Sequence, residues 1–186
     1  MGLDLVEFLI AVETAFDLTI SDEQAGGISS PRELIAHLAT CVPLADAPSA
    51  RCQTQRAFYR LRAACQRQLD VPRSQLRPDT SVVAILTAPG ASDQWRRIQD
   101  QLGATAWPHL RQNPLMIALR GVDRLTLGQT ARHLAQWHPA LLKAADEGWT
   151  LDEIEHTVIA ILEELHGIDI KAHSLDAHFV TDLLLD

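Results

Sequence analysis

Apolar side chains recur at every third or fourth position in several separate stretches, and this spacing predicts amphipathic helices. Between these stretches the chain is polar or carries Gly and Pro, which predicts turns and short connections. The stretches with helical period are residues 3–16, 31–40, 53–69, 94–102 and 150–166. The pattern therefore predicts an all-α protein.

Polar residues at the ends of these stretches predict where helices begin and end. Thr150 is followed three residues later by Glu153, the spacing of a capping box, and Gly167 stands where a helix ends in the left-handed conformation. Ser29 or Ser30 is expected to cap a helix with Pro31 in its first turn. These signals predict well-defined termini for the helices at both ends of the chain.

The chain has 186 residues, of which 47% are hydrophobic, so it can bury one good core or two small ones. No run of about 18 apolar residues is present, and the acidic N-terminus lacks the basic region of a signal peptide. The three cysteines have no metal-like spacing, and we interpret them as reduced thiols. We therefore expect a cytoplasmic protein without a membrane span.

Charge is distributed very unevenly along the chain. Residues 1–50 carry eight acidic side chains and one basic, residues 51–144 carry fourteen basic and five acidic, and residues 145–186 carry eleven acidic and one basic. A basic middle segment thus lies between two acidic ends. Such asymmetry is evidence about binding partners rather than about the fold.

The two ends, joined in permuted order, resemble an acyl carrier protein. Residues 179–186 (FVTDLLLD) followed by 3–23 (LDLVEFLIAVETAFDLTISDE) match the first loop, the attachment region, the long acidic second helix and the turn after it. Residues 3–40 cover the carboxyl-terminal half of such a protein almost without gaps. The resemblance implies a carrier-protein-like four-helix bundle built from both chain termini.

The domain organisation implied by this resemblance has four segments. Residues 1–41 would supply the carboxyl-terminal half of the bundle, 42–51 a linker, 52–144 a basic helical insert, and 145–186 the amino-terminal half. The insert itself resembles a degenerate carrier-like bundle in its VPRSQLRPDTSVVAIL segment and in residues 125–134, although an unrelated helical insert explains it nearly as well.

The terminal halves can bury their apolar stripes only against each other, because isolated amphipathic helices of this length are marginal in water. We favour a bundle within one chain, because closing a long loop adds little entropy cost. A swapped homodimer is the alternative.

Carrier proteins bear phosphopantetheine on a serine between Asp and Leu at the start of the acidic helix. Here Asp186 matches the Asp and Leu3 the Leu, but Gly2 stands where the Ser belongs; Leu184 also replaces the usual Gly. The resemblance thus implies a degenerate attachment site and no cofactor. The alternative is a working carrier that holds phosphopantetheine on Ser92, a weak fallback better explained as a helix cap, or on a serine from another chain.

In carrier proteins the second helix and the turn after it dock onto basic patches of partner enzymes. A solvated helix face explains the corresponding acids about equally well. The expected partner is a basic protein surface, either within this chain or on an enzyme of fatty-acid or polyketide synthesis. The residues of the expected docking face are Asp4, Glu7, Glu13, Asp17, Asp22 and Glu23.

No His-Glu-x-x-His, Cys-x-x-Cys or Gly-rich phosphate motif is present, so we expect neither an enzyme nor a metal site. The basic middle segment is a candidate for binding nucleic acid, which we rank third because helix-turn-helix signals are missing and the acidic ends repel phosphate. Its basic residues are Arg56, Arg60, Arg67, Arg73, Arg77, Arg96 and Arg97. The leading hypothesis is a non-catalytic carrier-like module for protein–protein interaction or regulation.

Overall fold

The computed structural model describes residues 2–47, 52–87, 89–108, 125–144 and 146–185. This part of the chain contains nine α-helices, two short 3₁₀ helices and no strand, which confirms the all-α prediction. None of the described helices is long and apolar enough to cross a membrane. The chain divides into two compact units, unit 1 (Met1–Ala50 and Lys143–Asp186) and unit 2 (Arg51–Leu142).

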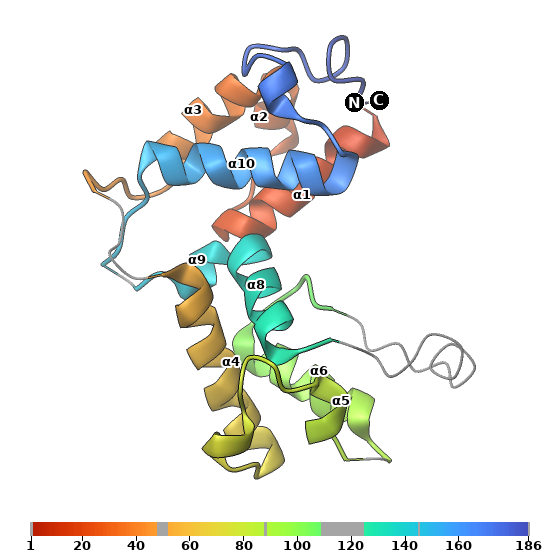
Figure 1. The fold of residues 1–186 in the computed structure, drawn as a ribbon. Coiled ribbons are helices and arrows are strands. Elements are labelled where there is room, and N and C mark those ends of the chain that lie inside the picture. The colour runs from red at the N-terminus through yellow and green to blue at the C-terminus, as the bar shows by residue number, and fades with distance from the viewer. Residues whose placement is uncertain (1, 48–51, 88, 109–124, 145, 186) are drawn as a thin grey trace. The chain divides into compact units, whose positions relative to one another are not determined.

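Unit 1 combines segments from both ends of the chain (Figure 1). Its elements are α1 (Leu3–Phe16), α2 (Asp22–Gly26), α3 (Pro31–Cys41), α10 (Leu151–His166) and the 3₁₀ helix η2 (Ile170–Ala172). Both α1 and α3 pack against α10. The buried core includes Phe8 of α1, whose ring centroid lies 5.5 Å from that of Phe179. Residues more than 150 positions apart therefore share one core.

The helix ends of unit 1 follow the capping pattern of the sequence. The Thr150 side chain accepts from the Glu153 amide while the Glu153 side chain accepts from the Thr150 amide, and Gly167 ends α10 with φ 67°. Ser30, rather than Ser29, caps α3, with Pro31 in the first turn. The capping box of α10 and the left-handed end are thus confirmed.

A backbone pairing joins the end of the first segment to the start of the last. The Trp149 amide donates to the Pro43 carbonyl at 2.7 Å, and the Ala45 amide donates to the Trp149 carbonyl at 2.8 Å. A Cβ on Gly148 would lie 2.8 Å from the Leu44 carbonyl group, so only glycine allows this approach. Residues 43–45, which the sequence placed in a plain linker, are therefore part of unit 1.

The loop that follows α10 is attached to the start of α3. The Arg32 amide donates to the Leu175 carbonyl at 2.9 Å, and the Phe179 amide donates to the Ser29 carbonyl at 2.8 Å. The Arg32 guanidinium also pairs with Asp176, and this hydrogen bond lowers the pKa of the Asp176 carboxyl. The loop is thereby held in one position beside the bundle.

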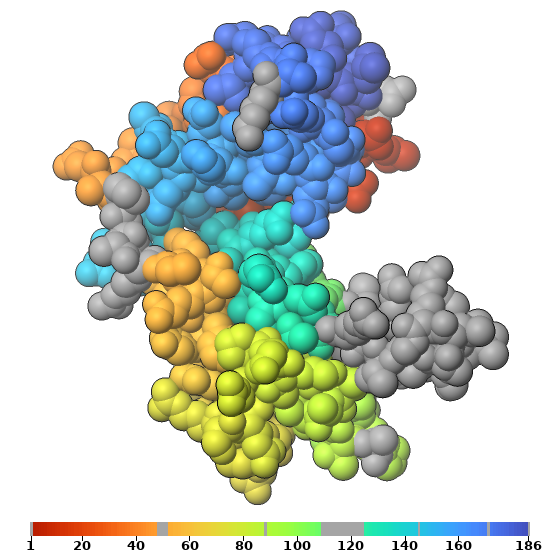
Figure 2. Space-filling view, viewed as in Figure 1, coloured from red at the N-terminus to blue at the C-terminus, as the bar shows by residue number. Residues whose placement is uncertain are grey.

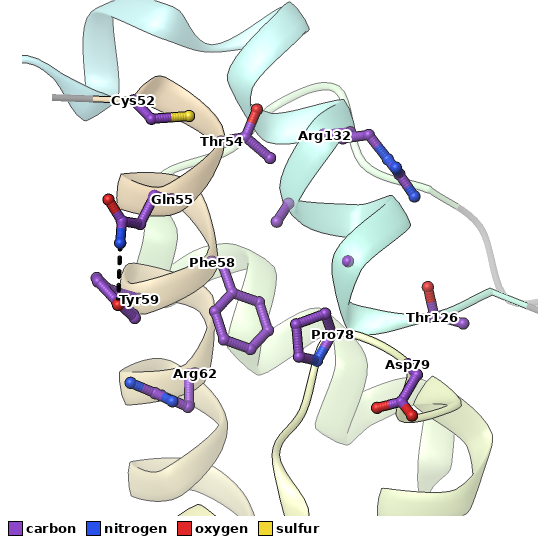
Figure 3. Close-up of a pocket in the computed structure, with 12 residues that line it drawn as sticks. Cys52, Thr54, Gln55, Phe58, Tyr59, Arg62, Pro78, Asp79, Thr126 and Arg132 are labelled. Carbon is purple, nitrogen blue, oxygen red and sulfur yellow. Dashed lines mark hydrogen bonds between the residues drawn. The ribbon is translucent and has the colours of Figure 1, made fainter.

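Unit 2 consists of α4 (Gln53–Leu69), η1 (Arg73–Gln75), α5 (Val82–Ile85), α6 (Ala91–Leu102), α8 (Leu127–Trp137) and α9 (Pro139–Leu142). The long helix α4 packs against α6 and α8. Thr126 and Gln129 form a capping box at the start of α8, and Gly128 allows the Pro78 carbonyl to approach to hydrogen-bonding distance of its amide, 2.8 Å. A hollow lies between α4 and α8 (Figure 3).

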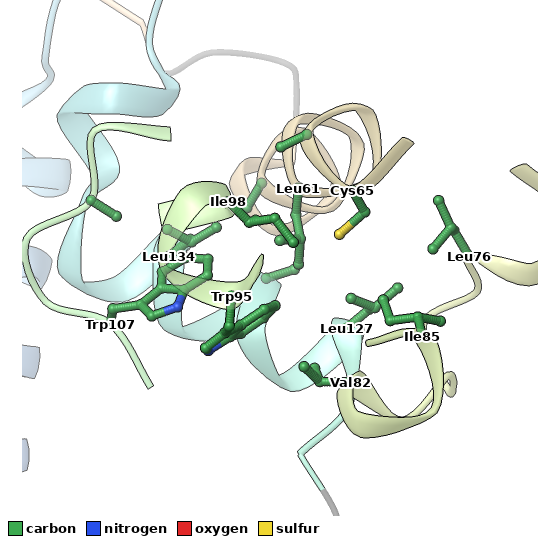
Figure 4. Close-up of a cluster of buried hydrophobic side chains, with 14 of the residues drawn as sticks. Leu61, Cys65, Leu76, Val82, Ile85, Trp95, Ile98, Trp107, Leu127 and Leu134 are labelled. Carbon is green, nitrogen blue, oxygen red and sulfur yellow. The ribbon is translucent and has the colours of Figure 1, made fainter. Parts of the chain in front are cut away.

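The core of unit 2 lies where α4, α6 and α8 meet (Figure 4). Leu61 and Cys65 of α4 are fully buried there, and burial raises the pKa of the Cys65 thiol to about 12. The rings of Trp95 and Trp107 lie 4.7 Å apart. Phe58 is only partly buried against this core, whereas Ala57 and Ala64 of the same helix are fully buried.

Candidate docking surfaces

The outer face of α1 combines apolar and acidic side chains. Leu3 is 85% exposed and Ile10 56% exposed, while Asp4 and Glu7 are also exposed. Residues 3, 7 and 10 lie on one face because they are spaced by four and three positions. The beginning of α1 lies at the surface in the space-filling view (red in Figure 2). Exposed large apolar residues beside carboxylates are typical of a protein-binding surface.

The remaining acids of the expected docking face have different positions. Glu13 is partly buried, and its carboxylate accepts from the Ile20 amide at 2.6 Å, so it holds the turn after α1. Asp17 ends α1 in the left-handed conformation with φ 54°. Asp22 and Glu23 are exposed in the first turn of α2, where the helix dipole favours negative charge. Only Asp4 and Glu7 lie beside Leu3 and Ile10 on α1.

The region expected to match the carrier attachment site has no hydroxyl at the start of α1. Gly2 is the N-cap of this helix and provides no side-chain hydrogen bond. Asp186 lies outside the described residues. Leu184, at the position where carrier proteins usually have Gly, adopts φ 58° and leaves its side chain 74% exposed. A left-handed conformation at a leucine is strained.

Ser92 lies in the first turn of α6, and its side chain is exposed. The N-cap of this helix is Gly90, with φ 111°, so the interpretation of Ser92 as a helix cap was wrong. The helix begins at Ala91, three residues before the expected start, because glycine adopts this conformation without strain. Ser92 is thus accessible to solvent at a helix N-terminus.

The arginines of the expected basic patch are used in different ways. Arg56 and Arg60 donate to the carbonyls of Leu142 and Leu141, so both connect α4 to α9. Arg77 forms an exposed ion pair with Asp79 at 3.6 Å. The remaining members, all exposed and distributed over α4, η1 and α6, are Arg67, Arg73, Arg96 and Arg97.

Two arginines that the expected basic patch did not include lie at a hollow of unit 2. Arg62 and Arg132 both line the hollow between α4 and α8, with Phe58 and Tyr59 (Figure 3). The spacing of Tyr59 and Arg62, three residues apart on one helix, could have shown that they share a face. No pattern in the sequence could have shown that Arg132 lies across from them.

Among the described residues, no group of three or more His, Cys, Asp or Glu side chains could hold a metal ion. Comparison of the chain with models of known protein families, with curated proteins and with solved structures gave no match. Function must therefore be argued from the surfaces themselves.

Proposed function

We propose that unit 1 is a non-catalytic, carrier-like interaction module that binds a basic protein surface through the outer face of α1. The observation that carries this proposal is the exposure of Leu3 and Ile10 beside Asp4 and Glu7. Apolar contacts would supply affinity, and the carboxylates would select a basic partner and guide it into place.

The arrangement of unit 1 supports a carrier-like bundle. Starting from α10, the order is a long helix, a long loop, the acidic helix α1, the short helix α2 and then α3, which is the order that the resemblance implies. The left-handed Leu184 supports it further, because this is the position at which carrier proteins have glycine. The absence of a hydroxyl at Gly2 favours a binding role over a cofactor-bearing one.

A basic amphipathic peptide provides the test of docking. A short fluorescein-labelled peptide with Arg on both sides of a Leu-Leu pair should bind the full chain, and Asp4→Lys/Glu7→Lys should weaken binding by about tenfold or more. Glu163→Lys/Glu164→Lys on α10 makes the same change of charge in the same unit and should leave binding within about twofold. Equal losses in both double variants would mean that only overall charge attracts the peptide, and the proposal would fail.

The second candidate is a working carrier modified on Ser92. It is favoured by the exposed position of Ser92 in the first turn of α6, next to Asp93. Intact mass should be measured after incubation with a promiscuous phosphopantetheinyl transferase and coenzyme A. The leading proposal expects no gain. A gain of one phosphopantetheine that is lost in Ser92→Ala would establish the second candidate instead.

A further inference from the structure

The hollow between α4 and α8 of unit 2 has an apolar floor. It has a volume of about 730 Å³, within the range of sites that bind ligands or side chains. Phe58 and Pro78 lie next to each other between the two helices (Figure 3). An apolar side chain of an incoming molecule would find a complementary site there.

Arginines lie on both sides of this floor. Arg62 stands on the α4 side and Arg132 on the α8 side, and within the described part of the chain neither forms an ion pair. Among the described residues that line the hollow, the one acid, Asp79, is paired with Arg77. The edges of the hollow therefore attract carboxylates.

A second hollow extends this surface along α4. It has a volume of about 450 Å³, shares Tyr59 and Arg62 with the first, and adds Gln66 and Arg73. The two together form a groove along α4, with the apolar floor in the first hollow, Arg62 where the two hollows join and Arg73 in the second. An extended chain segment fits such a shape better than a small molecule does.

The aromatic side chains of the groove contact an arginine. The Arg62 guanidinium lies 4.9 Å from the centroid of the Tyr59 ring and 5.3 Å from that of Phe58, so it occupies part of the ring surface that a nucleic-acid base would use. Proteins that bind single strands instead leave aromatic faces free for the bases. A guanidinium that lies over aromatic rings can still donate its N–H groups to a carboxylate.

We propose that the groove lined by Phe58, Arg62, Arg73 and Arg132 binds an acidic peptide segment of a partner protein. One apolar side chain of the segment packs against Phe58 and Pro78, and its carboxylates bind Arg62 and Arg132. This site is separate from the α1 surface. It selects an acidic partner, whereas the α1 surface selects a basic one.

The test uses the full chain and a short fluorescein-labelled peptide with glutamates on both sides of a Leu-Phe pair. Its affinity is measured by fluorescence anisotropy. Arg62→Glu/Arg132→Glu should weaken binding by at least about tenfold, whereas Arg96→Glu/Arg97→Glu, the same change on α6 of the same unit, should stay within about twofold. A peptide with Ser-Ser in place of Leu-Phe should also bind at least about tenfold more weakly.

Three outcomes would overturn the proposal. Equal losses in the two double variants would show attraction by overall charge alone. If Arg132→Glu and Arg62→Glu/Arg132→Glu bound the peptide as tightly as the wild type and kept its helical circular dichroism, the peptide would bind elsewhere. If a labelled oligothymidylate bound more tightly than the peptide, and Arg62→Glu/Arg132→Glu abolished that binding, the groove would be assigned to single-stranded nucleic acid.

Discussion

Units 1 and 2 are built in the same way but carry opposite charge. In each, one long helix packs against two others: α10 against α1 and α3, and α4 against α6 and α8. Unit 1 contains nineteen acidic and three basic side chains, whereas unit 2 contains five acidic and thirteen basic, with no Glu and no Lys. The buried stripes determine how helices pack, and the exposed positions are free to acquire either charge.

The two units also differ in how the chain builds them. Unit 2 is one continuous segment, while unit 1 joins two segments separated by the whole of unit 2. The difference teaches that a bundle requires the right helices to meet, not a particular order along the chain. The following predictions test this comparison, beginning with the largest expected effect.

Replacing a buried core side chain by alanine should show that the stability of unit 1 depends on both ends of the chain. Phe8 is fully buried against Phe179, so Phe8→Ala should lower the free energy of unfolding by about 3–5 kcal/mol. Hydrogen exchange should then rise in α1 and also in α10 and the loop after it. Leu61→Ala, in unit 2, should cost about 2–5 kcal/mol and increase exchange in α4, α6 and α8.

Ile10→Ala provides the control for this experiment, because Ile10 lies on the exposed face of the same helix. It should change stability by no more than about 0.5 kcal/mol. If Phe8→Ala increased exchange in α1 but not in α10, the joint core of the two terminal segments would be disproved.

A methyl group at the close backbone contacts should destabilise both units. Gly148→Ala in unit 1 would place Cβ 2.8 Å from the Leu44 carbonyl, and Gly128→Ala in unit 2 would place it 2.8 Å from the Pro78 carbonyl. Each should cost about 1–3 kcal/mol in thermal or urea unfolding. Gly26→Ala, where nothing lies within 4 Å, should not destabilise unit 1; a loss there equal to that of Gly148→Ala would contradict the steric explanation.

The backbone of unit 1 is strained at Leu184. Its φ of 58° disfavours any residue with a Cβ, so Leu184→Gly should stabilise unit 1 by about 1 kcal/mol. The side chain is 74% exposed, so little packing is lost. Leu184→Ala keeps the Cβ and should give no such gain. A melting temperature unchanged by glycine would show that the conformation is unstrained.

The smallest effect concerns pH and unit 2. His138 is buried with Nε2 3.0 Å from the Ala106 nitrogen and 2.8 Å from its oxygen, and burial lowers the pKa of its imidazole. The unfolded chain therefore binds a proton more readily than the folded one. This contribution to stability is complete above about pH 6.5 and is lost as pH falls towards the lowered folded pKa.

Urea unfolding of the wild type and of His138→Gln, followed between about pH 5 and 8, measures this dependence. The variant should show a weaker dependence on pH over the acidic part of the range. An identical slope in both proteins would mean that His138 does not couple protonation to the folding of unit 2.

Part of the candidate sites could be read from the sequence. Asp4 and Glu7 were expected on a docking face because of the resemblance, whereas the exposure of Leu3 and Ile10 beside them was found only in the structure. The basic patch could not be read in the same way. Arg56 and Arg60 donate to carbonyls of α9, while Arg62 remains at the groove, and this depends on which backbone lies near each guanidinium.

The sequence by itself determined the ends of several helices, although not the start of α6. Apolar period and capping are interactions between residues a few positions apart, so Thr150, Glu153 and Gly167 define α10 without reference to the rest of the chain. That both termini share one unit was expected from the resemblance and from no local pattern. Only the tertiary structure decided the pairing of residues 43–45 with Trp149 and the meeting of Arg62 and Arg132 at one groove, because these depend on segments that pack together from distant parts of the chain.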